Sequence, residues 1–496
     1  MSTKDFAAPA AERENEEVPA SRPSLFSQPK GLLTLSATEM WERFSFYGLQ
    51  VILAYYLYYS LSEGGLGIAT PVALGIAGAY GGVVYISQML GGWLADRLLA
   101  PRTLVLVGGI LIMLGHIALA VLPGIAGLMA GLLLIVLGTG GLKVNTTSMV
   151  GELYSREDSR RDVGYSIYYT GISIGAFLGP LLTGFLQPEF GFHVAFSAAA
   201  VGMGLGLVQY VFGMKRLPAV TRTVPNPLPR QMRARAALIA VVGAAALVTG
   251  TVTGFINFEN IDTLVTVIVL VAALAYFAVL LSSRKVDRAE RLMVHTYIPV
   301  FLSSLLFWTL LFQLFTTLAL YMDTRVNLTI GDLTLPPALI ITLEGLFATL
   351  IAPVFAAIWA KMGTAQPESG KKVVAGIACM SLTLLSFAFM GQTTGPVNSV
   401  LVVLIAMVLF GVAEIVVVPT ALSLTARLAP RAASAQMTSL YFLTMAGGST
   451  LSGFIAQAYS PENEGFFFSV VGLGSLAAAV GLYLVYRALN RKVPAL

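Results

Sequence analysis

The chain has little charge and almost no cysteine or histidine. Of its 496 residues, 11% are charged and 56% are hydrophobic, whereas soluble globular chains are about 25% charged and about 45–50% apolar. The single cysteine, Cys379, excludes a disulfide within the chain and a cysteine-based zinc or iron–sulfur site. The three histidines are scattered and form no ligand cluster in the sequence. We therefore expect no metal and no organic cofactor.

Long hydrophobic runs take the place of the missing charge. Segments of about 20 apolar residues, the length that crosses a bilayer as a helix, recur from Leu32 nearly to the C-terminus. They predict an all-α membrane protein that uses the lipid bilayer as its solvent. The fourteen predicted spans are approximately 31–61, 72–95, 103–122, 125–149, 164–187, 191–213, 236–256, 262–283, 296–322, 336–361, 371–391, 398–422, 434–457 and 466–487.

The basic residues collect on one side of the predicted spans. With the N-terminus inside, nearly all of the 30 Lys and Arg residues fall in the tails or in the loops that follow even-numbered spans, and Arg325 alone falls in an outer loop. Because Lys and Arg are retained on the cytoplasmic side, we expect a multi-pass protein of the cytoplasmic membrane with both termini in the cytoplasm. The formal net charge of +5 then reflects topology and not nucleic-acid binding.

The chain divides at a basic, proline-containing linker after the sixth span. Residues 1–30 are polar and predict a disordered cytoplasmic tail. We predict a six-helix bundle over 31–213, basic linkers with an extra transmembrane hairpin over 214–295, and a second six-helix bundle over 296–488. The hairpin is predicted because spans seven and eight hold almost no polar groups suited to a pathway. The alternative is that these two spans are ordinary members of the bundle.

Six ionisable groups besides histidine lie deep inside predicted spans. Each costs roughly 2.5–3.5 kcal/mol at the centre of a span, so we expect them to face a central aqueous cavity. Four acids against two bases leave surplus negative charge, which protons or a cationic substrate must balance. This imbalance favours proton coupling; the alternative is a set of buried ion pairs that lock the helices together. The groups are Glu39, Glu42, Arg43, Lys143, Glu344 and Glu414.

Sequence motifs of enzymes are missing or misplaced. There is no GxxxxGK[ST] loop, which argues against a pump with its own ATPase domain. The segment Gly171–Gly175 matches GxSxG, but a nucleophile elbow needs a strand–turn–helix setting and this segment lies inside a predicted span. We predict that the protein is not an enzyme and that an ion gradient supplies its energy.

Four segments resemble a known transporter family. Residues 92–97, Gly-Trp-Leu-Ala-Asp-Arg, resemble the 2–3 loop motif of the major facilitator superfamily. Residues 39–48 are similar to the ExxERF signature of the proton-dependent oligopeptide transporter (POT) family, and residues 141–145 and 414–430 resemble its fourth- and tenth-helix segments. The resemblance covers all fourteen predicted helices. The short outer loop at 392–397 is typical of prokaryotic members.

The resemblance implies a major facilitator fold whose two bundles rock about a central site for a di- or tripeptide and protons. Arg43 and Lys143 would bind the peptide carboxylate. The Arg43 guanidinium can donate two parallel hydrogen bonds to it, and Lys143 adds a second positive charge. Glu414 would bind the amino group and take part in proton coupling, and Glu39 and Glu42 would link protonation to the neighbouring cations. The implied pocket side chains are Tyr47, Tyr85, Ser173, Trp308 and Tyr441.

The chain also departs from the family pattern. Ser173 replaces an asparagine and Tyr441 a tryptophan, which changes the pocket. Phe312 stands where an acid is usual, and Gln50 stands where its arginine partner is usual. Loss of both together avoids a stranded buried charge, which would cost about 3–5 kcal/mol. We therefore expect no outer ionic gate.

One acid is gained in the second half. Glu344 stands where the family has an asparagine at the peptide amino end. Our hypothesis is that it takes over a proton-coupling or amine-binding role; the alternative is a carboxyl kept protonated by burial.

The sequence thus predicts proton-coupled import of di- and tripeptides by a monomer that binds no nucleic acid. Alternatives are a POT-family transporter of nitrate, an amino acid or a peptidomimetic, and a peptide sensor that does not transport.

Overall fold

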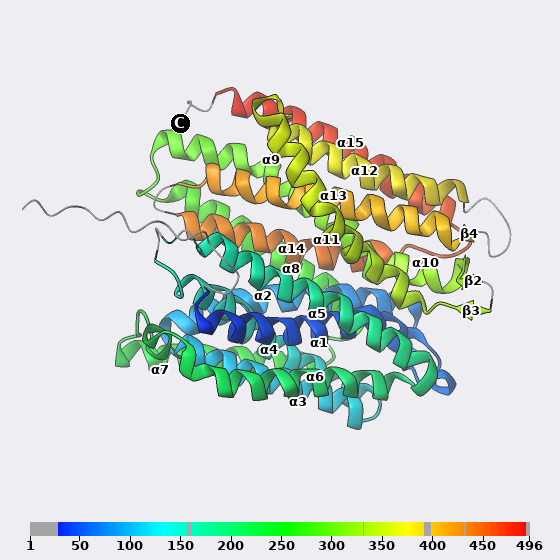
Figure 1. The fold of residues 1–496 in the computed structure, drawn as a ribbon, viewed down its shortest axis with the longest axis horizontal. Coiled ribbons are helices and arrows are strands. Elements are labelled where there is room, and N and C mark those ends of the chain that lie inside the picture. The colour runs from blue at the N-terminus through cyan, green and yellow to red at the C-terminus, as the bar shows by residue number, and fades with distance from the viewer. Residues whose placement is uncertain are drawn as a thin grey trace, which may run out of the picture.

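The structure is a computed structural model that describes residues 28–155, 158, 160–330, 332–390, 398–430 and 433–492. Within these residues it is built almost entirely from long helices that run along its longest axis (Figure 1). The helices of the first half are α1 (Lys30–Tyr58), α2 (Thr70–Arg97), α3 (Pro101–Val121), α4 (Gly124–Gly151), α5 (Arg161–Phe190) and α6 (Phe192–Gly213). They are followed by α7 (Arg230–Val252) and α8 (Ile261–Ser282).

The second half holds the remaining helices and four very short strands. The helices are α9 (Arg288–Leu311), α10 (Thr317–Arg325), α11 (Pro337–Met362), α12 (Ser369–Met390), α13 (Val400–Arg427), α14 (Ser434–Ala456) and α15 (Glu464–Asn490). Strand β1 (Val326–Asn327) pairs in parallel with β4 (Asn398–Ser399), and β2 (Thr329–Ile330) pairs antiparallel with β3 (Leu333–Thr334). The predicted all-α class is confirmed, since these strands only tie loops together at one end of the helices.

Every predicted span coincides with helix. The ninth is divided, because a 3₁₀ turn at Phe312–Phe315 separates α9 from α10. Among the described residues, 12 helices are long and apolar enough to cross a membrane. Two further long helices fall outside that set: α1 contains the buried charges, and α14 is rich in Ser, Thr and Gly. The protein is therefore a multi-pass membrane protein, and its most polar helices are held inside it.

Glycines let α5 lie directly against α1. A Cβ added at Gly175 would lie 2.0 Å from the Met40 carbonyl oxygen, and one at Gly179 would lie 2.0 Å from that of Phe44. Small residues of this kind allow close backbone approach in membranes, where burial of apolar surface from water does not drive helix pairing. Since α6 also packs on α1, the polar face of α1 is held in the interior.

The two halves meet along α2 with α14 and along α5 with α11. Gly78 and Gly453 permit the first contact, and the Ser449 hydroxyl donates a 2.9 Å hydrogen bond to the Gly78 carbonyl oxygen. At the end of the molecule that carries the strands, the Tyr58 and Tyr59 hydroxyls donate to Asp323 of α10 at 2.7 and 2.8 Å. These hydrogen bonds join α1 to α10 at that end of the molecule.

Helices α7 and α8 differ in how they are packed. No described residue of α7 is buried, whereas α8 packs against α2, α9 and α14. Buried Asp262 of α8 accepts a hydrogen bond from Gln457, just beyond the end of α14. The division into two bundles and a hairpin stays a prediction, and most of the predicted tail and the loop at 392–397 lie outside the described residues.

The contact between α5 and α1 generates a stability prediction. Gly175→Ala places a Cβ against backbone that cannot turn away, so we expect destabilisation by about 2 kcal/mol, as overpacking usually costs. The matched control is Gly481→Ala in α15, where an added Cβ meets nothing within 4 Å. Its melting temperature in detergent micelles should be unchanged or higher, because Ala is the better helix former. Equal melting temperatures for the two variants would contradict the packing role of Gly175.

Candidate functional site

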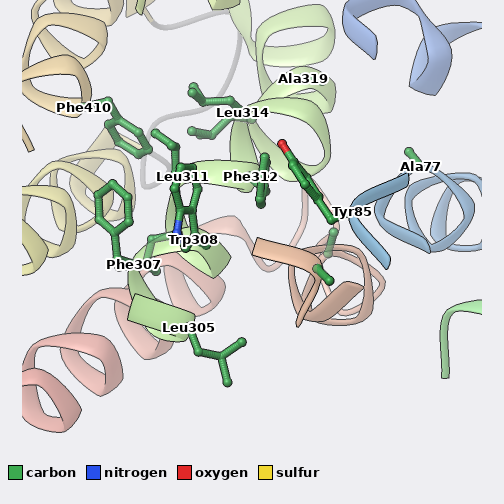
Figure 2. Close-up of a cluster of buried hydrophobic side chains, with 14 of the residues drawn as sticks. Ala77, Tyr85, Leu305, Phe307, Trp308, Leu311, Phe312, Leu314, Ala319 and Phe410 are labelled. Carbon is green, nitrogen blue, oxygen red and sulfur yellow. The ribbon is translucent and has the colours of Figure 1, made fainter. Parts of the chain in front are cut away.

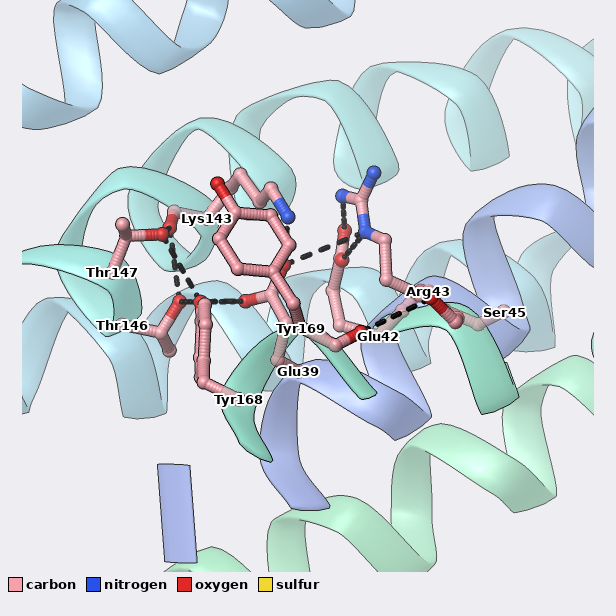
Figure 3. A network of polar contacts seen from close by, with 10 residues as sticks. Glu39, Glu42, Arg43, Ser45, Lys143, Thr146, Thr147, Tyr168 and Tyr169 are labelled. Carbon is pink, nitrogen blue, oxygen red and sulfur yellow. Dashed lines mark hydrogen bonds and ion pairs between the residues drawn. The ribbon is translucent and has the colours of Figure 1, made fainter. Parts of the chain in front are cut away.

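Four of the predicted buried charges form one network between α1 and α4 (Figure 3). The Arg43 guanidinium donates two hydrogen bonds to the Glu42 carboxylate, at 2.5 and 2.7 Å. The Arg43 Nε atom also lies 3.6 Å from Glu39 Oε1, and Lys143 donates a hydrogen bond to that same oxygen. Glu39 and Glu42 are 0% exposed and Arg43 is 4% exposed. Both cations are thus held by carboxylates.

The second oxygen of Glu39 is bound by two hydroxyl groups. Thr146 donates to Glu39 Oε2 at 2.6 Å, and Tyr168 of α5 donates to it at 2.9 Å. Neither hydroxyl was expected as a partner of Glu39 from the sequence. Thr146 follows Lys143 by three residues and so shares its helix face, which is a usable signal. Nothing in the sequence links Tyr168 to Glu39, since that contact depends on how α5 packs.

Two aromatic rings lie close to the Arg43 guanidinium. The guanidinium carbon is 4.7 Å from the ring centroid of Phe46 and 5.6 Å from that of Tyr47. A cation over an aromatic face is attracted by the ring quadrupole. Tyr47 also interacts electrostatically with Glu414 of α13. Tyr47 therefore lies between the charge network of the first half and the carboxyl groups of the second.

The other two predicted charges form a separate pair. Helices α11 and α13 come together at Gly411, where an added Cβ would lie 3.2 Å from the Glu344 carbonyl oxygen. The Glu344 and Glu414 side chains interact with each other where these two helices meet. Glu344 is 8% exposed, and its Oε1 atom has no partner among the described residues. We expected the six charged side chains to form one central group. The structure divides them into two clusters, and Tyr47 interacts with members of both.

Aromatic rings connect the halves where the family usually has an ion pair. Phe312 stacks on Trp308 at a centroid distance of 5.4 Å and lies 5.8 Å from Tyr85 of α2 (Figure 2). Gln50 is buried and its Oε1 atom has no partner in the described part of the chain. At Phe312 and Tyr85 the two halves therefore meet through uncharged rings.

Several buried polar atoms of this central region have no hydrogen-bond partner among the described residues. Such atoms are rare in folded proteins and call for water, an ion or a ligand as partner. They include Glu344 Oε1, the Tyr80 hydroxyl and Gln313 Oε1. They come from α11, from α2 and from the turn after α9, so both halves of the chain contribute such atoms.

The predicted pocket residue Ser173 uses its hydroxyl within its own helix. The hydroxyl donates to the Tyr169 carbonyl oxygen of α5 at 3.2 Å. The GxSxG segment is continuous helix here, and Gly171 and Gly175 serve close packing against α1. Among the described residues, no group of three or more His, Cys, Asp or Glu side chains is placed to hold a metal ion.

The fold and these residues agree with the comparison to known proteins. A sequence model described as the POT family matches residues 102–469. The chain belongs to the POT family. The match covers the Lys143 segment and the tenth-helix segment with Glu414, and the first-helix residues 39–48 lie before it.

Full-length relatives extend the match over nearly the whole chain. An uncharacterized transporter of Bacillus subtilis is 37% identical over 96% of this chain and 98% of its own length. A di-/tripeptide transporter of Lactococcus lactis is 36% identical over 93% of this chain and 96% of its own length. A solved POT peptide transporter in complex with sulfate is 40% identical, covers 94% of this chain and 96% of its own, and has a TM-score of 0.91.

The pairing of Lys143 with Glu39 generates a testable prediction. Lys143→Gln leaves a buried carboxylate short of its nearest cation, and we expect the free energy of unfolding to fall by about 3 kcal/mol. The double variant Lys143→Gln/Glu39→Gln removes both charges and should recover most of that loss. A double-mutant cycle in detergent micelles measures the coupling. Additive effects of the two substitutions would contradict the proposed pairing.

Proposed function

We propose that this protein is a proton-coupled symporter that imports di- and tripeptides across the cytoplasmic membrane by alternating access. The proposal is based on one observation, which is that both buried cations, Arg43 and Lys143, are already paired with acids. Arg43 is bound by Glu42 and Lys143 by Glu39, so a substrate carboxylate can bind them only when one of these acids gives way. Protonation is the step that removes the negative charge of such an acid.

Charge balance links the proton to the peptide. When Glu42 takes up a proton, its carboxyl becomes neutral and its hold on Arg43 weakens. The peptide carboxylate can then accept the two parallel hydrogen bonds of the guanidinium and restore neutrality in the buried network. Each binding event favours the other, and this reciprocity is what symport requires. Glu39 remains with Lys143, Thr146 and Tyr168 and keeps the neighbouring lysine in place.

The amino end of the peptide is assigned to the second half. Glu414 would pair with the ammonium group, while Tyr47, Tyr85, Trp308 and Tyr441 would surround the peptide. A zwitterion held in this way joins the α1 network to α13 and favours closure of the two halves around it. The coupling ion is the proton, and no metal or organic cofactor takes part. We propose a monomer, because one chain contains both halves.

Uptake of labelled dialanine into proteoliposomes tests the function. With an inward proton gradient, wild-type protein should concentrate dialanine, because coupling carries it against its own gradient. Glu42→Gln should abolish concentrative uptake while still allowing exchange, since a neutral side chain here cannot carry the proton. Arg43→Ala should reduce both concentrative uptake and exchange of dialanine by at least about tenfold, because it removes a buried charge-assisted hydrogen bond to the peptide carboxylate.

The controls are Glu189→Gln and Arg222→Ala, which replace exposed residues of the same two types. Both should accumulate dialanine like the wild type. Saturable dialanine binding without accumulation would instead indicate a sensor. If dialanine neither binds nor accumulates, the substrate belongs to another class, such as an amino acid, nitrate or a peptidomimetic.

Membrane orientation has its own test. In a Cys379→Ser background, Ser62→Cys places a thiol in the exposed turn after α1, and Arg222→Cys places one in the linker after α6. With both termini in the cytoplasm, an impermeant maleimide should label Ser62→Cys in intact cells and Arg222→Cys only after permeabilisation. The reverse pattern would overturn the proposed topology.

A further inference from the structure

The Glu344–Glu414 pair is chemically unlike the network on α1. In that network each acid is matched with a base, whereas among the described residues neither Glu344 nor Glu414 forms an ion pair. The two side chains interact with each other where α11 and α13 approach closely at Gly411. Titratable groups that face Glu414 from neighbouring helices are the hydroxyls of Tyr47, Tyr85 and Tyr441. None of these hydroxyls supplies a positive charge.

The closeness of the Glu344 and Glu414 carboxyl groups limits their combined charge. Two like charges close together and largely shielded from water are strongly disfavoured, and one shared proton removes the repulsion. The pair without substrate therefore holds one proton and carries a charge of about −1. One peptide ammonium neutralises that charge. If the shared proton leaves, the pair carries a charge of about −2 and matches two cationic groups.

We propose that Glu344 and Glu414 form a charge-adjusting receptor for the amino end of the substrate, which accepts a basic first residue by releasing the proton they share. The inference rests on the proposed function and names a substrate class for the same site: peptides with a lysine or arginine at the amino end. Glu344 Oε1, buried and without a described partner, is the free acceptor for the second cation.

The carboxyl group of Glu344 is what gives the site this property. An amide at position 344 would have no proton to release, and Glu414 alone could then offer a single negative charge only. With Glu344 present, a second cation is neutralised inside the site. The released proton passes to water in the substrate pathway, no covalent bond changes, and the total charge of the occupied site stays the same for neutral and basic peptides.

The sign of the pH dependence follows from proton release. Binding of lysyl-alanine releases a proton that binding of dialanine does not release. By linkage, a ligand whose binding releases a proton binds more tightly as the pH rises. The ratio of the lysyl-alanine affinity to the dialanine affinity should therefore rise with pH. A proton taken up elsewhere in the site affects both peptides alike and cancels in this ratio.

The test is a set of binding measurements on the purified full-length protein in detergent at pH 6 and pH 7.5. For the wild type, the affinity ratio of lysyl-alanine to dialanine should increase by about tenfold between the two pH values. Alanyl-lysine is the matched ligand, since its basic side chain lies at the other end, and its ratio to dialanine should stay constant. In Glu344→Gln the increase should disappear, and Glu344→Asn should reproduce that loss if the glutamine variant is unstable.

The matched control variant is Glu462→Gln, which alters an exposed acid in the loop before α15 and should keep the wild-type increase. A wild-type ratio that does not change with pH would overturn the inference, and so would a persisting increase in Glu344→Gln. If dialanine binds and only the ratio is constant, the charge-adjusting pair fails while peptide transport stands. If neither peptide binds, both proposals fail together.

Discussion

The double hydrogen bond from Arg43 to Glu42 is the interaction on which the rest of the protein depends. In a membrane interior an unpaired charge is costly, so the chain must bring both groups together and surround them with protein. In the proposed mechanism, a proton on Glu42 removes its charge, and an incoming carboxylate replaces it on Arg43 with no net change in buried charge.

Close packing makes this arrangement possible. Helix α1 carries three charged side chains in its middle and would be a poor membrane span alone. Glycines of α5 bring that helix against the α1 backbone, and α4 supplies Lys143 from the other side. The tyrosines at the end of α1 then reach Asp323 and join the two halves at one end. Polar contacts of α1 therefore both form the candidate site and connect α1 to α10 in the second half of the chain.

The sequence predicted the helices well because bilayer thickness sets their length, and a run of about 20 apolar residues is a strong signal. It also placed Glu39, Glu42, Arg43 and Lys143 deep inside the protein, but it predicted one central group that included Glu344 and Glu414, and pairing between acids and bases was only the alternative. It did not predict the break at Phe312, which lies in an apolar run with no Pro or Gly, nor the hydroxyl of Tyr168 on Glu39. Such contacts depend on the rotation and depth of each helix, which apolar periodicity leaves open when all faces are hydrophobic.

Proton exchange on substrate binding tests the central claim most directly. Calorimetric titration of dialanine into the purified protein, repeated in buffers of different ionisation enthalpy, reports the number of protons taken up when the peptide binds. The account predicts uptake of about one proton near neutral pH, and none in Glu42→Gln. Binding of dialanine to the wild type without proton uptake, or equal uptake in Glu42→Gln, would contradict the exchange of a proton for the peptide carboxylate at Arg43.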